Sequence, residues 1–311
     1  MLLHHRASLT PLPRVVILGA GGFLSPVLRR NLKMHGASVA ALGRAAIDLS
    51  VPDAGTRLAQ HLGPQDVVVM AAGLTPDKGK NVATLMANLR MGEAVSRAIE
   101  QVRPAQFIYI SSDGVYDARF SSLLNEESTS EPADLYCLMH VAREKILAQS
   151  CRQAGIPFLV VRPCAIYGPG DTHNSYGPNR FFRSALNDGK ITLFGNGEER
   201  RHHVFVDDVA ELIRLCIAHA STGVINAVTG RAISFGELAE KIVRLVGGRV
   251  VVERQPRVSP VTHRHFDTSA LARAFPSFRA TSLDDGFEKM LAGLSEANPA
   301  AEEQEAVCLR S

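Results

Sequence analysis

The stretch Arg14-Val-Val-Ile-Leu-Gly-Ala-Gly-Gly-Phe-Leu-Ser25 decides the fold of this chain of 311 residues. It opens with a short apolar run that predicts a buried strand, and an amphipathic stretch to about Met34 follows. Between them stand three glycines, Gly19, Gly21 and Gly22. Glycines at such a junction permit a tight turn and let backbone N–H groups approach a pyrophosphate at the positive end of a helix. We therefore predict a dinucleotide-binding loop, against the alternative of a loop that only turns the chain.

The rest of the first half repeats this strand–helix pattern. Apolar runs at 38–42, 66–70, 106–110 and 158–161 predict further strands, and helical patterns lie near 53–62, 81–101 and 134–153. Strands that alternate with helices at this spacing form a parallel sheet with helices on both faces, and such sheets bind ligands at the carboxyl ends of their strands. The sequence thus predicts an α/β fold with a Rossmann-type doubly wound parallel sheet.

The composition of the chain changes at about residue 163, where glycine and proline become frequent and the predicted strands become short. We expect residues 14–162 to form the main part of a dinucleotide-binding domain. Residues 163–294 are expected to form mainly a smaller C-terminal α/β lobe that binds the substrate. Residues 1–13 show no periodicity and predict a flexible lead, and residues 295–311 predict a flexible tail.

Composition excludes several classes of protein. Hydrophobic residues make up 46% and charged residues 21%, as in ordinary globular proteins. The net charge of +3 is too small for a nucleic-acid scaffold, and no apolar run approaches the roughly 18 residues of a membrane span. No signal-peptide core opens the chain, and the five cysteines are scattered without paired spacing, which predicts neither disulfides nor a zinc ribbon. We expect a cytoplasmic protein that binds neither nucleic acid nor membrane.

The end of the predicted second strand bears on the choice of dinucleotide. A fold that prefers NAD usually places an acidic residue there, which accepts from the ribose 2′-hydroxyl. This chain has Gly43-Arg44 instead, and an arginine can pair with the 2′-phosphate of NADP. The cofactor is therefore NAD or NADP, with NADP slightly favoured, although such arginines are often only solvated. Asp48 lies just beyond and is a candidate for the adenine amino group or for a helix cap.

Six motifs occur in order along the chain. They are Gly19-x-x-Gly22-x-x-Ser25, Ser111-Ser112-x-x-Val115-Tyr116, Tyr136-x-x-x-His140, Arg162-Pro163-x-x-x-Tyr167-Gly168-Pro169, Gly195-x-Gly197-x-x-x-Arg201 with Val206-Asp207-Asp208, and Thr281-Ser282-Leu283-Asp284-Asp285-Gly286. Each motif is weak alone, but together they resemble the extended short-chain dehydrogenase/reductase family. This group includes nucleotide-sugar epimerases, such as 4-epimerases, together with dehydratases and ketoreductases. The resemblance runs from about Arg14 to Leu294.

The resemblance implies roles for residues that follow the predicted strands. Tyr136 would transfer the proton of a sugar hydroxyl, with Ser112, Asp113 and His140 beside it. A phenol, whose pKa is about 10, acts as a base only if cationic neighbours lower that pKa. The implied contacts with the dinucleotide are Gly19, Gly21, Gly22, Phe23, Leu24, Arg44, Asp48, Leu49, Ala71, Ala72, Gly73, Tyr136, His140 and Pro163.

The chain departs from the family at three positions. His140 stands where the family has lysine, on the helix face of Tyr136, and would be a weaker and pH-dependent source of positive charge. Ser25 replaces the third glycine of the loop, and we expect this small residue to be tolerated. Gly114 follows Asp113 where the family's 4,6-dehydratases carry glutamate, and glycine has no side chain to abstract a proton.

Polar residues of the second half are candidates for binding a nucleotide diphosphate. Arg201 matches the family's pyrophosphate arginine, and a guanidinium offers both charge and forked geometry. Arg257, Asn179 and Arg180 are looser candidates, and Ser112 would contact the sugar. Each arginine has the alternative of an ordinary solvated residue. The histidines at 202, 203, 263 and 265 lack carboxylate or cysteine partners at ligand spacing, so we predict no metal.

The leading hypothesis is an NAD(P)-dependent epimerase that acts on a nucleotide-activated sugar by transient oxidation of a ring hydroxyl, at C4. The alternative is an NADPH-dependent nucleotide-sugar ketoreductase or dehydrogenase, which Arg44 favours. A catalytically silent dinucleotide-binding regulatory protein is a third alternative, which His140 favours. The resemblance also implies a homodimer through the helices near 81–101 and 134–153.

Overall fold

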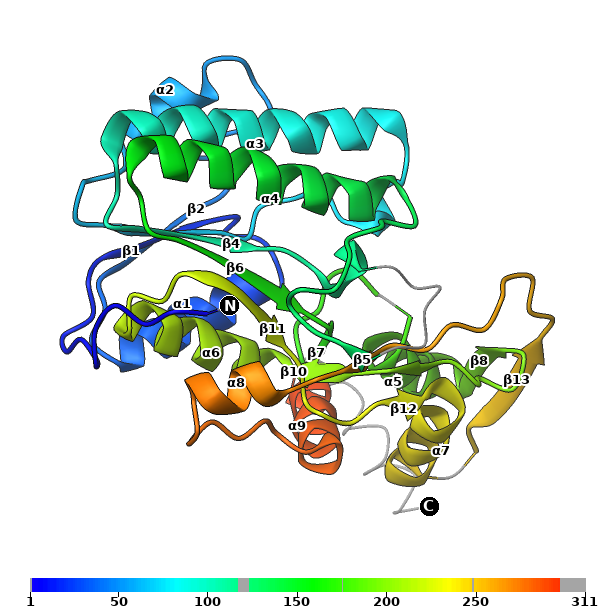
Figure 1. The fold of residues 1–311 in the computed structure, drawn as a ribbon. Coiled ribbons are helices and arrows are strands. Elements are labelled where there is room, and N and C mark those ends of the chain that lie inside the picture. Colours follow the sequence, from blue (N-terminus) through cyan, green and yellow to red (C-terminus); the bar gives the residue numbers. More distant parts are fainter. Residues whose placement is uncertain (1, 117–122, 175, 248, 297–311) are drawn as a thin grey trace.

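A computed structural model describes residues 2–116, 123–174, 176–247 and 249–296 of the chain. Within these ranges six parallel strands form the central sheet, in the order β2-β1-β3-β4-β6-β11 (Figure 1). They are β1 (Val15–Leu18), β2 (Val39–Leu42), β3 (Val67–Met70), β4 (Gln106–Ile110), β6 (Phe158–Pro163) and β11 (Gly223–Ala227). The first five coincide with the strands predicted from the sequence, so the Rossmann-type fold is confirmed.

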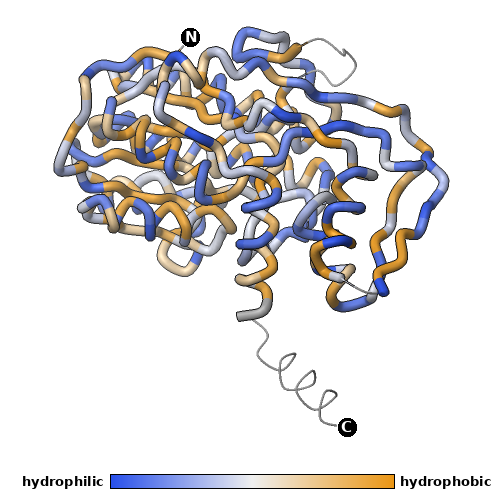
Figure 2. Tube along the Cα trace, turned by 90° about the horizontal axis from the view of Figure 1, so that it is seen from below, coloured by the Kyte–Doolittle hydropathy of each residue, from blue (hydrophilic) through white to orange (hydrophobic). Residues whose placement is uncertain are grey.

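Helices cover both faces of this sheet (Figure 1). They are α1 (Leu24–Met34) and α6 (Val206–Ala218) on one face, and α2 (Ala54–Ala59), α3 (Val82–Val102) and α4 (Leu135–Ala154) on the other. Val15 and Ile17 of β1 join the core under α1 and α6, whereas Val16 and Leu18 join the core under α2 to α4. Because both faces are covered, the strands are almost wholly apolar, and Figure 2 shows hydrophobic stretches running through the interior.

The sixth strand comes from the second half of the chain. After the predicted boundary at residue 163 the chain leaves the sheet, but α6 and β11 return to it, and Val224 pairs with Val160 of β6. The lobe predicted over 163–294 is therefore interrupted by residues 206–227, which complete the central sheet and one of its helical layers. The sequence analysis missed β11 because only Val224 and Ile225 give it a strong apolar signal.

A smaller α/β lobe follows the sheet and has a hydrophobic core of its own. Its helices are α5 (Pro178–Asp188), α7 (Phe235–Val246) and α9 (Leu283–Glu296), while α8 (Ser269–Ala274) packs near β11. Short strands pair in twos: β7 (Ala165–Tyr167) with β10 (His203–Phe205), β8 (Lys190–Phe194) with β13 (Val251–Gln255), β9 (Arg200–Arg201) with β12 (Ile233–Ser234), and β5 (Leu123–Leu124) with β14 (His265–Phe266). Short 3₁₀ helices, η1 (Pro76–Lys78) and η2 (Asp113–Val115), follow β3 and β4. No helix in the described ranges is long and apolar enough to cross a membrane.

The segment predicted to be a flexible lead is attached to the fold. The His4 ring lies 2.8 Å from the Ser221 hydroxyl and 3.0 Å from the Ala274 carbonyl. Leu12 is buried in the core between the sheet and helices α1 and α6. The prediction is corrected here, because these partners lie far along the chain and leave no local signal. Residues 297–311 of the predicted tail lie outside the described residues.

A buried ion pair joins α4 to β6. Arg162 donates to both carboxylate oxygens of Glu144, at 3.0 and 2.6 Å, and the two side chains are 8% and 10% exposed. Ser111 at the end of β4 donates its hydroxyl to the same carboxylate at 2.5 Å, and Arg162 also donates to the Tyr116 hydroxyl at 2.9 Å. Because both charges are buried away from water, removal of either Arg162 or Glu144 would leave the other charge uncompensated.

Arg162→Met is expected to lower the free energy of unfolding by about 3–5 kcal/mol, because it leaves the Glu144 carboxylate buried without its cation. Arg97→Met is the matched control, since the Arg97–Glu93 pair is exposed and such helix pairs contribute roughly 0.3–0.5 kcal/mol. Urea denaturation measures both variants. Equal losses of unfolding free energy in the two variants would contradict a special role for the buried Arg162–Glu144 pair.

Candidate active site

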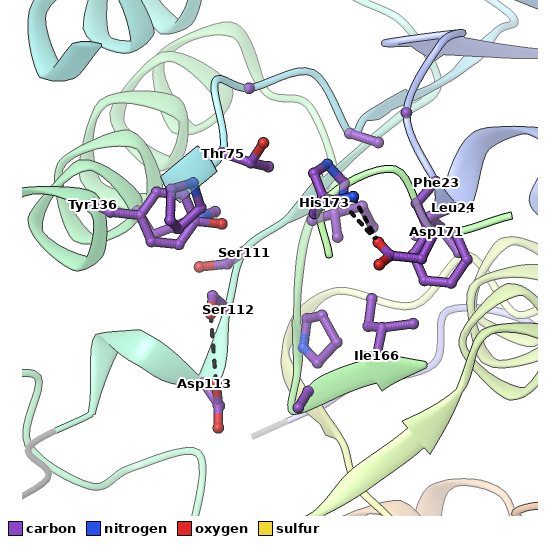
Figure 3. A pocket seen from close by; sticks show the side chains of 18 of the residues that line it. Phe23, Leu24, Thr75, Ser111, Ser112, Asp113, Tyr136, Ile166, Asp171 and His173 are labelled. Atoms are coloured by element: carbon purple, nitrogen blue, oxygen red, sulfur yellow. Dashed lines mark hydrogen bonds and ion pairs between the residues drawn. The ribbon is translucent and has the colours of Figure 1, made fainter. Parts of the chain in front are cut away.

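One cavity of about 340 Å³ lies between the sheet and the second lobe (Figure 3). Its walls come from the loops that follow four strands, from one face of α4 and from the second lobe. The lining residues fall within segments 22–25, 71–76, 110–113, 136–143 and 163–179. The cavity thus includes the loops after β1 and β3, where the strand order reverses, and this is the usual ligand site of such sheets.

The glycine loop after β1 is held by a close backbone contact and by a hydroxyl. Gly19 has a φ of +104°, and a Cβ at this position would lie 2.9 Å from backbone atoms of Ala72. Ser25, at the position of the third glycine, is buried and donates its hydroxyl to the Gly19 carbonyl at 2.7 Å. The serine is therefore accommodated and stabilises the loop, whose Gly22 and Phe23 line the cavity.

Most of the residues predicted to contact a dinucleotide meet at this cavity. Those that line it are Gly22, Phe23, Leu24, Ala71, Ala72, Gly73, Tyr136, His140 and Pro163. Those that do not line it are Gly19, Gly21, Arg44, Asp48 and Leu49. Leu49 is buried in the core under α2 to α4, so its side chain is committed to packing.

Arg44 is engaged in an ion pair at the surface. Its Nε donates to Asp48 at 2.9 Å, and its side chain is 81% exposed. The other carboxylate oxygen of Asp48 accepts from the backbone N–H and the hydroxyl of Ser50, at 3.0 and 2.5 Å. The bonds from Ser50, together with Arg44, hold the pKa of Asp48 below its usual value. A carboxylate therefore stands beside the arginine that was predicted to favour a 2′-phosphate.

The predicted catalytic residues converge from two elements. Ser112 and Asp113 follow β4, whereas Tyr136 and His140 lie one turn apart on α4, and all four line the cavity. The helix begins here because Asp134 caps it, accepting a first-turn N–H at 2.8 Å. The rings of Tyr136 and His140 pack edge to face with centroids 4.9 Å apart. In Figure 3 Tyr136 and Ser112 face the same space.

Burial keeps both rings of α4 neutral. Desolvation raises the pKa of Tyr136 above its usual range, and Tyr109 and Cys137 raise it further, while the charge of Arg143 opposes the rise. Desolvation lowers the pKa of His140 to about 3, and Arg143 adds to this effect. At neutral pH the free protein therefore presents a protonated phenol and an uncharged imidazole. The prediction that His140 brings positive charge to Tyr136 is wrong for this reason.

The fixed positive charge at this site belongs to Arg143, which the sequence analysis did not identify. Among the described residues that line the cavity, it is the only lysine or arginine. Its buried guanidinium donates to the carbonyls of Ala72, at 2.7 Å, and Asn88, at 2.9 and 2.7 Å. The Asn88 side chain in turn bonds the backbone of Leu74. Arg143 lies two helical turns after Tyr136 on the same face, and this spacing was the available signal.

Two predicted substrate-binding arginines, Arg201 and Arg257, meet at Glu199. The carboxylate of Glu199 lies 3.5 Å from Arg201 and 3.4 Å from Arg257. Arg201 also donates to the carbonyl and the hydroxyl of Thr262. Neither arginine lines the cavity, and Arg180 is exposed on α5 and does not line it either.

Asn179 and Arg264 connect the cavity to the second lobe. Asn179 lines the cavity, but its amide accepts from Gly168 N–H at 3.1 Å and donates to the Ile166 carbonyl at 3.3 Å, so it shapes the wall. Arg264 forms an ion pair with Asp113 at 3.1 Å. The sequence analysis passed over Arg264 because no family motif marks this position.

Gly114 is buried, and its surroundings leave no space for a larger side chain. A Cβ at this position would lie 2.8 Å from the Cys137 sulfur and 3.3 Å from the Ser112 hydroxyl oxygen. A side chain able to abstract a proton therefore does not fit directly after Asp113.

Two of the histidines considered as metal ligands, His202 and His203, are buried. Desolvation, aided by neighbouring histidine, lowers their pKa values to about 4 and about 3. Across the described part of the chain, no group of three or more His, Cys, Asp or Glu side chains is arranged to hold a metal ion. Because folding lowers the pKa values of these rings, we expect acid to destabilise the fold.

The chain is similar in sequence to several known proteins. The model of the NAD dependent epimerase/dehydratase family matches residues 15–228. A UDP-glucose 4-epimerase of Mycolicibacterium smegmatis is 26% identical over 306 residues, which cover 89% of this chain and 96% of that protein. The human dTDP-D-glucose 4,6-dehydratase is 25% identical over 150 residues, or 48% of this chain and 43% of that protein. The chain thus spans less than half the length of the dehydratase relatives that it matches.

Solved structures share the fold over nearly the whole chain. The UDP-glucose 4-epimerase of Thermus thermophilus in complex with NAD has a TM-score of 0.79 at 20% identity, covering 90% of this chain and 98% of that one. DesIV, a dTDP-glucose 4,6-dehydratase of Streptomyces venezuelae with NAD and TYD bound, has a TM-score of 0.81 at 20% identity, covering 92% and 98%. Fold and motifs together define an extended short-chain dehydrogenase/reductase. Within that class, the chain belongs to the NAD-dependent epimerase/dehydratase family.

The buried histidines predict a loss of stability in acid. An unfolded histidine has a pKa of about 6.5 and folded His203 one of about 3, so the unfolded chain binds more protons between these values. The free energy of unfolding should therefore fall as the pH drops below about 6.5, with a slope approaching roughly 1.4 kcal/mol per pH unit for each such group. His203→Leu should remove one of these slopes, whereas His61→Gln, at an exposed position, should not. Urea denaturation from neutral to mildly acidic pH measures the profiles, and unchanged acid sensitivity in H203L would contradict the prediction.

Proposed function

We propose that the protein is an NAD-dependent epimerase of a nucleotide-activated sugar. It would oxidise a ring hydroxyl, at C4, and then reduce the resulting carbonyl on its opposite face. The observation that carries the proposal is the single cavity that joins the glycine loop to Ser112 and Tyr136. A 4-epimerase is also the relative that aligns over almost the whole chain.

The residues around the cavity fit a nicotinamide dinucleotide. The close approach of Gly19 to Ala72 places a loop free of large side chains before the N-terminus of α1, where a pyrophosphate would bind. His140 lines the same cavity, and its buried Nε2 has no partner among the described residues, which leaves a hydrogen bond for a ligand. When bound, the dinucleotide supplies the acceptor and donor of a hydride. Gly22 and Pro163 would contact it on either side of the cavity.

Tyr136 is the group that would move the proton. In the oxidation its phenolate would take the proton of the sugar hydroxyl, while the Ser112 hydroxyl would bond the same oxygen; in the reduction the phenol would return the proton. Because burial raises the pKa of Tyr136, the phenolate needs a nearby cation. Arg143, held by Ala72 and Asn88, lines the same cavity, and its positive charge opposes the rise in the pKa of Tyr136.

Arginines of the second lobe would bind the diphosphate of the substrate. Arg201 and Arg257 both approach the carboxylate of Glu199, and Arg257 also pairs with Glu198 at 3.6 Å. The Nε atoms of Arg257 and Arg264 are buried without a partner among the described residues, so each retains a donor for an anionic oxygen. Forked guanidinium donors suit phosphate oxygens.

Other reactions of the family are less well supported. Gly114, with the Cys137 sulfur against it, leaves no base for the 4,6-dehydration that glutamate serves in dehydratases. A ketoreductase is the second candidate, because the protonated Tyr136 of the free protein is the form that gives a proton to a carbonyl. The two differ in their use of cofactor: an epimerase retains its dinucleotide through turnover, whereas a ketoreductase consumes one per product.

We propose NAD rather than NADP as the cofactor, against the slight preference that Arg44 suggested. The Asp48 carboxylate, 2.9 Å from the Arg44 guanidinium, neutralises its charge and would repel a 2′-phosphate. The same carboxylate is able to accept from a ribose 2′-hydroxyl, which NAD retains.

Tyr136→Phe should lower turnover of UDP- or dTDP-linked hexoses by about 10²–10⁴-fold, because it removes the proton-transfer group. Its affinity for NAD should stay close to that of the wild type. Tyr176→Phe is the matched control, since Tyr176 lines the cavity from the second lobe, and it should retain most of the turnover. Turnover is followed by chromatography of the nucleotide sugars. A Y136F protein with turnover near that of the wild type would overturn the assignment.

Asp48→Asn should shift the ratio of NADP to NAD affinity toward NADP by about fivefold, or roughly 1 kcal/mol, because it frees the charge of Arg44. Asp53→Asn, at a nearby exposed position, should leave the ratio unchanged. Calorimetric titration with each dinucleotide measures the ratio. An unchanged ratio in D48N would show that Arg44 and Asp48 lie away from the ribose.

A further inference from the structure

Behind His140, a buried tyrosine of β4 contacts the imidazole. The Tyr109 hydroxyl lies 2.8 Å from Nδ1 of His140, and both side chains are buried. The other acceptor near this hydroxyl is the sulfur of Met139, at 3.9 Å. A thioether is a weak acceptor, so the imidazole nitrogen is the better partner for the hydroxyl proton.

The two rings have defined protonation states. Desolvation raises the pKa of Tyr109 to about 12, so its hydroxyl carries a proton at neutral pH. Desolvation and the charge of Arg143 lower the pKa of His140 to about 3, so its imidazole is neutral. A neutral imidazole has one N–H donor and one acceptor nitrogen. If Nδ1 accepts from Tyr109, the proton of the ring must reside on Nε2.

The other ring nitrogen of His140, Nε2, has no partner in the described part of the chain. His140 lines the cavity, and this atom is buried. A buried N–H group without an acceptor costs free energy, and an oxygen of a bound ligand would remove that cost. The glycine loop and Tyr136 border the same cavity, so a bound dinucleotide would pass between them and the ribose next to its nicotinamide would supply this oxygen.

We propose that Tyr109 is a positioning residue, which donates to Nδ1 of His140 and thereby keeps the ring proton on Nε2, from where it is donated to a ribose hydroxyl of the bound dinucleotide. The inference rests on the proposed function, because it takes the ligand to be a dinucleotide. It separates two tasks at this site: His140 is a neutral donor that depends on Tyr109, and Arg143 holds the positive charge.

A double-mutant cycle on NAD affinity tests whether Tyr109 acts through His140. Tyr109→Phe removes one hydroxyl, and His140→Gln replaces the imidazole by an amide, whose N–H donors do not depend on a tautomer. Y109F should weaken NAD binding about three- to tenfold in the wild-type background, but less than about twofold in the H140Q background. Equal losses in both backgrounds would overturn the proposal, because Tyr109 would then have only a structural role. Absence of any loss in Y109F would overturn it as well.

Tyr116→Phe is the matched control for the loss of a buried hydroxyl. Tyr116 also stands near the end of the sheet, but its hydroxyl bonds Asn226 and Arg162 rather than His140. Y116F should leave NAD affinity close to that of the wild type in both backgrounds. A loss of NAD affinity equal to that of Y109F would overturn the proposal, because the removal of any buried hydroxyl near the carboxyl ends of the strands would then have the same effect.

Nitrogen NMR of the protein labelled with ¹⁵N-histidine tests the tautomer without any ligand. The signal of His140 is assigned by its disappearance in H140Q. In the wild type it should show the proton on Nε2, and in Y109F it should show a share of protonation on Nδ1. Protonation on Nδ1 in the wild type would overturn the proposal. If NAD fails to bind any variant while the Nε2 tautomer is present, the proposed function fails and the role of Tyr109 on His140 stands.

Discussion

The buried guanidinium of Arg143 is the contact on which the site depends. It joins α4, which carries it, to the loop after β3 through the Ala72 carbonyl and to α3 through the Asn88 carbonyl. Gly19 of the glycine loop rests against the same Ala72 backbone. The helix face that bears Tyr136 is thereby fixed relative to the glycine loop. One desolvated charge therefore sets the geometry of the cavity and also opposes the rise in the pKa of Tyr136 that burial causes.

The sequence predicted those parts of the structure that are encoded locally. β1, β3, β4 and β6 are largely buried and, like β2, read as apolar runs. The glycine loop, Ser112 and Tyr136 are marked by motifs. β11 was missed because only Val224 and Ile225 give it a strong apolar signal, and its place in the sheet depends on pairing with β6. The roles of Tyr109 and Arg143 depend on partners 31 and 71 residues away, so the sequence offered only the helical spacing of Arg143 from Tyr136 as a signal.

His140, which replaces the family's lysine, behaves differently in the structure from what the sequence analysis predicted. The spacing suggested a weaker, titratable cation next to Tyr136. Burial lowers the pKa of the imidazole to about 3 and makes it neutral instead. The positive charge at the cavity is that of Arg143, on the next turn of α4. In this account, the hydrogen-bonding task and the electrostatic task of one lysine are divided between two side chains of α4.

The central claim is that the cavity holds a nicotinamide dinucleotide as the partner of Tyr136. Mass spectrometry of the supernatant, after denaturation of the freshly purified full-length protein, tests this most directly. The account predicts NAD or NADH in near-stoichiometric amount, because an epimerase does not release its cofactor between turnovers. A protein that carries no dinucleotide and binds neither NAD nor NADP in titration would contradict the account.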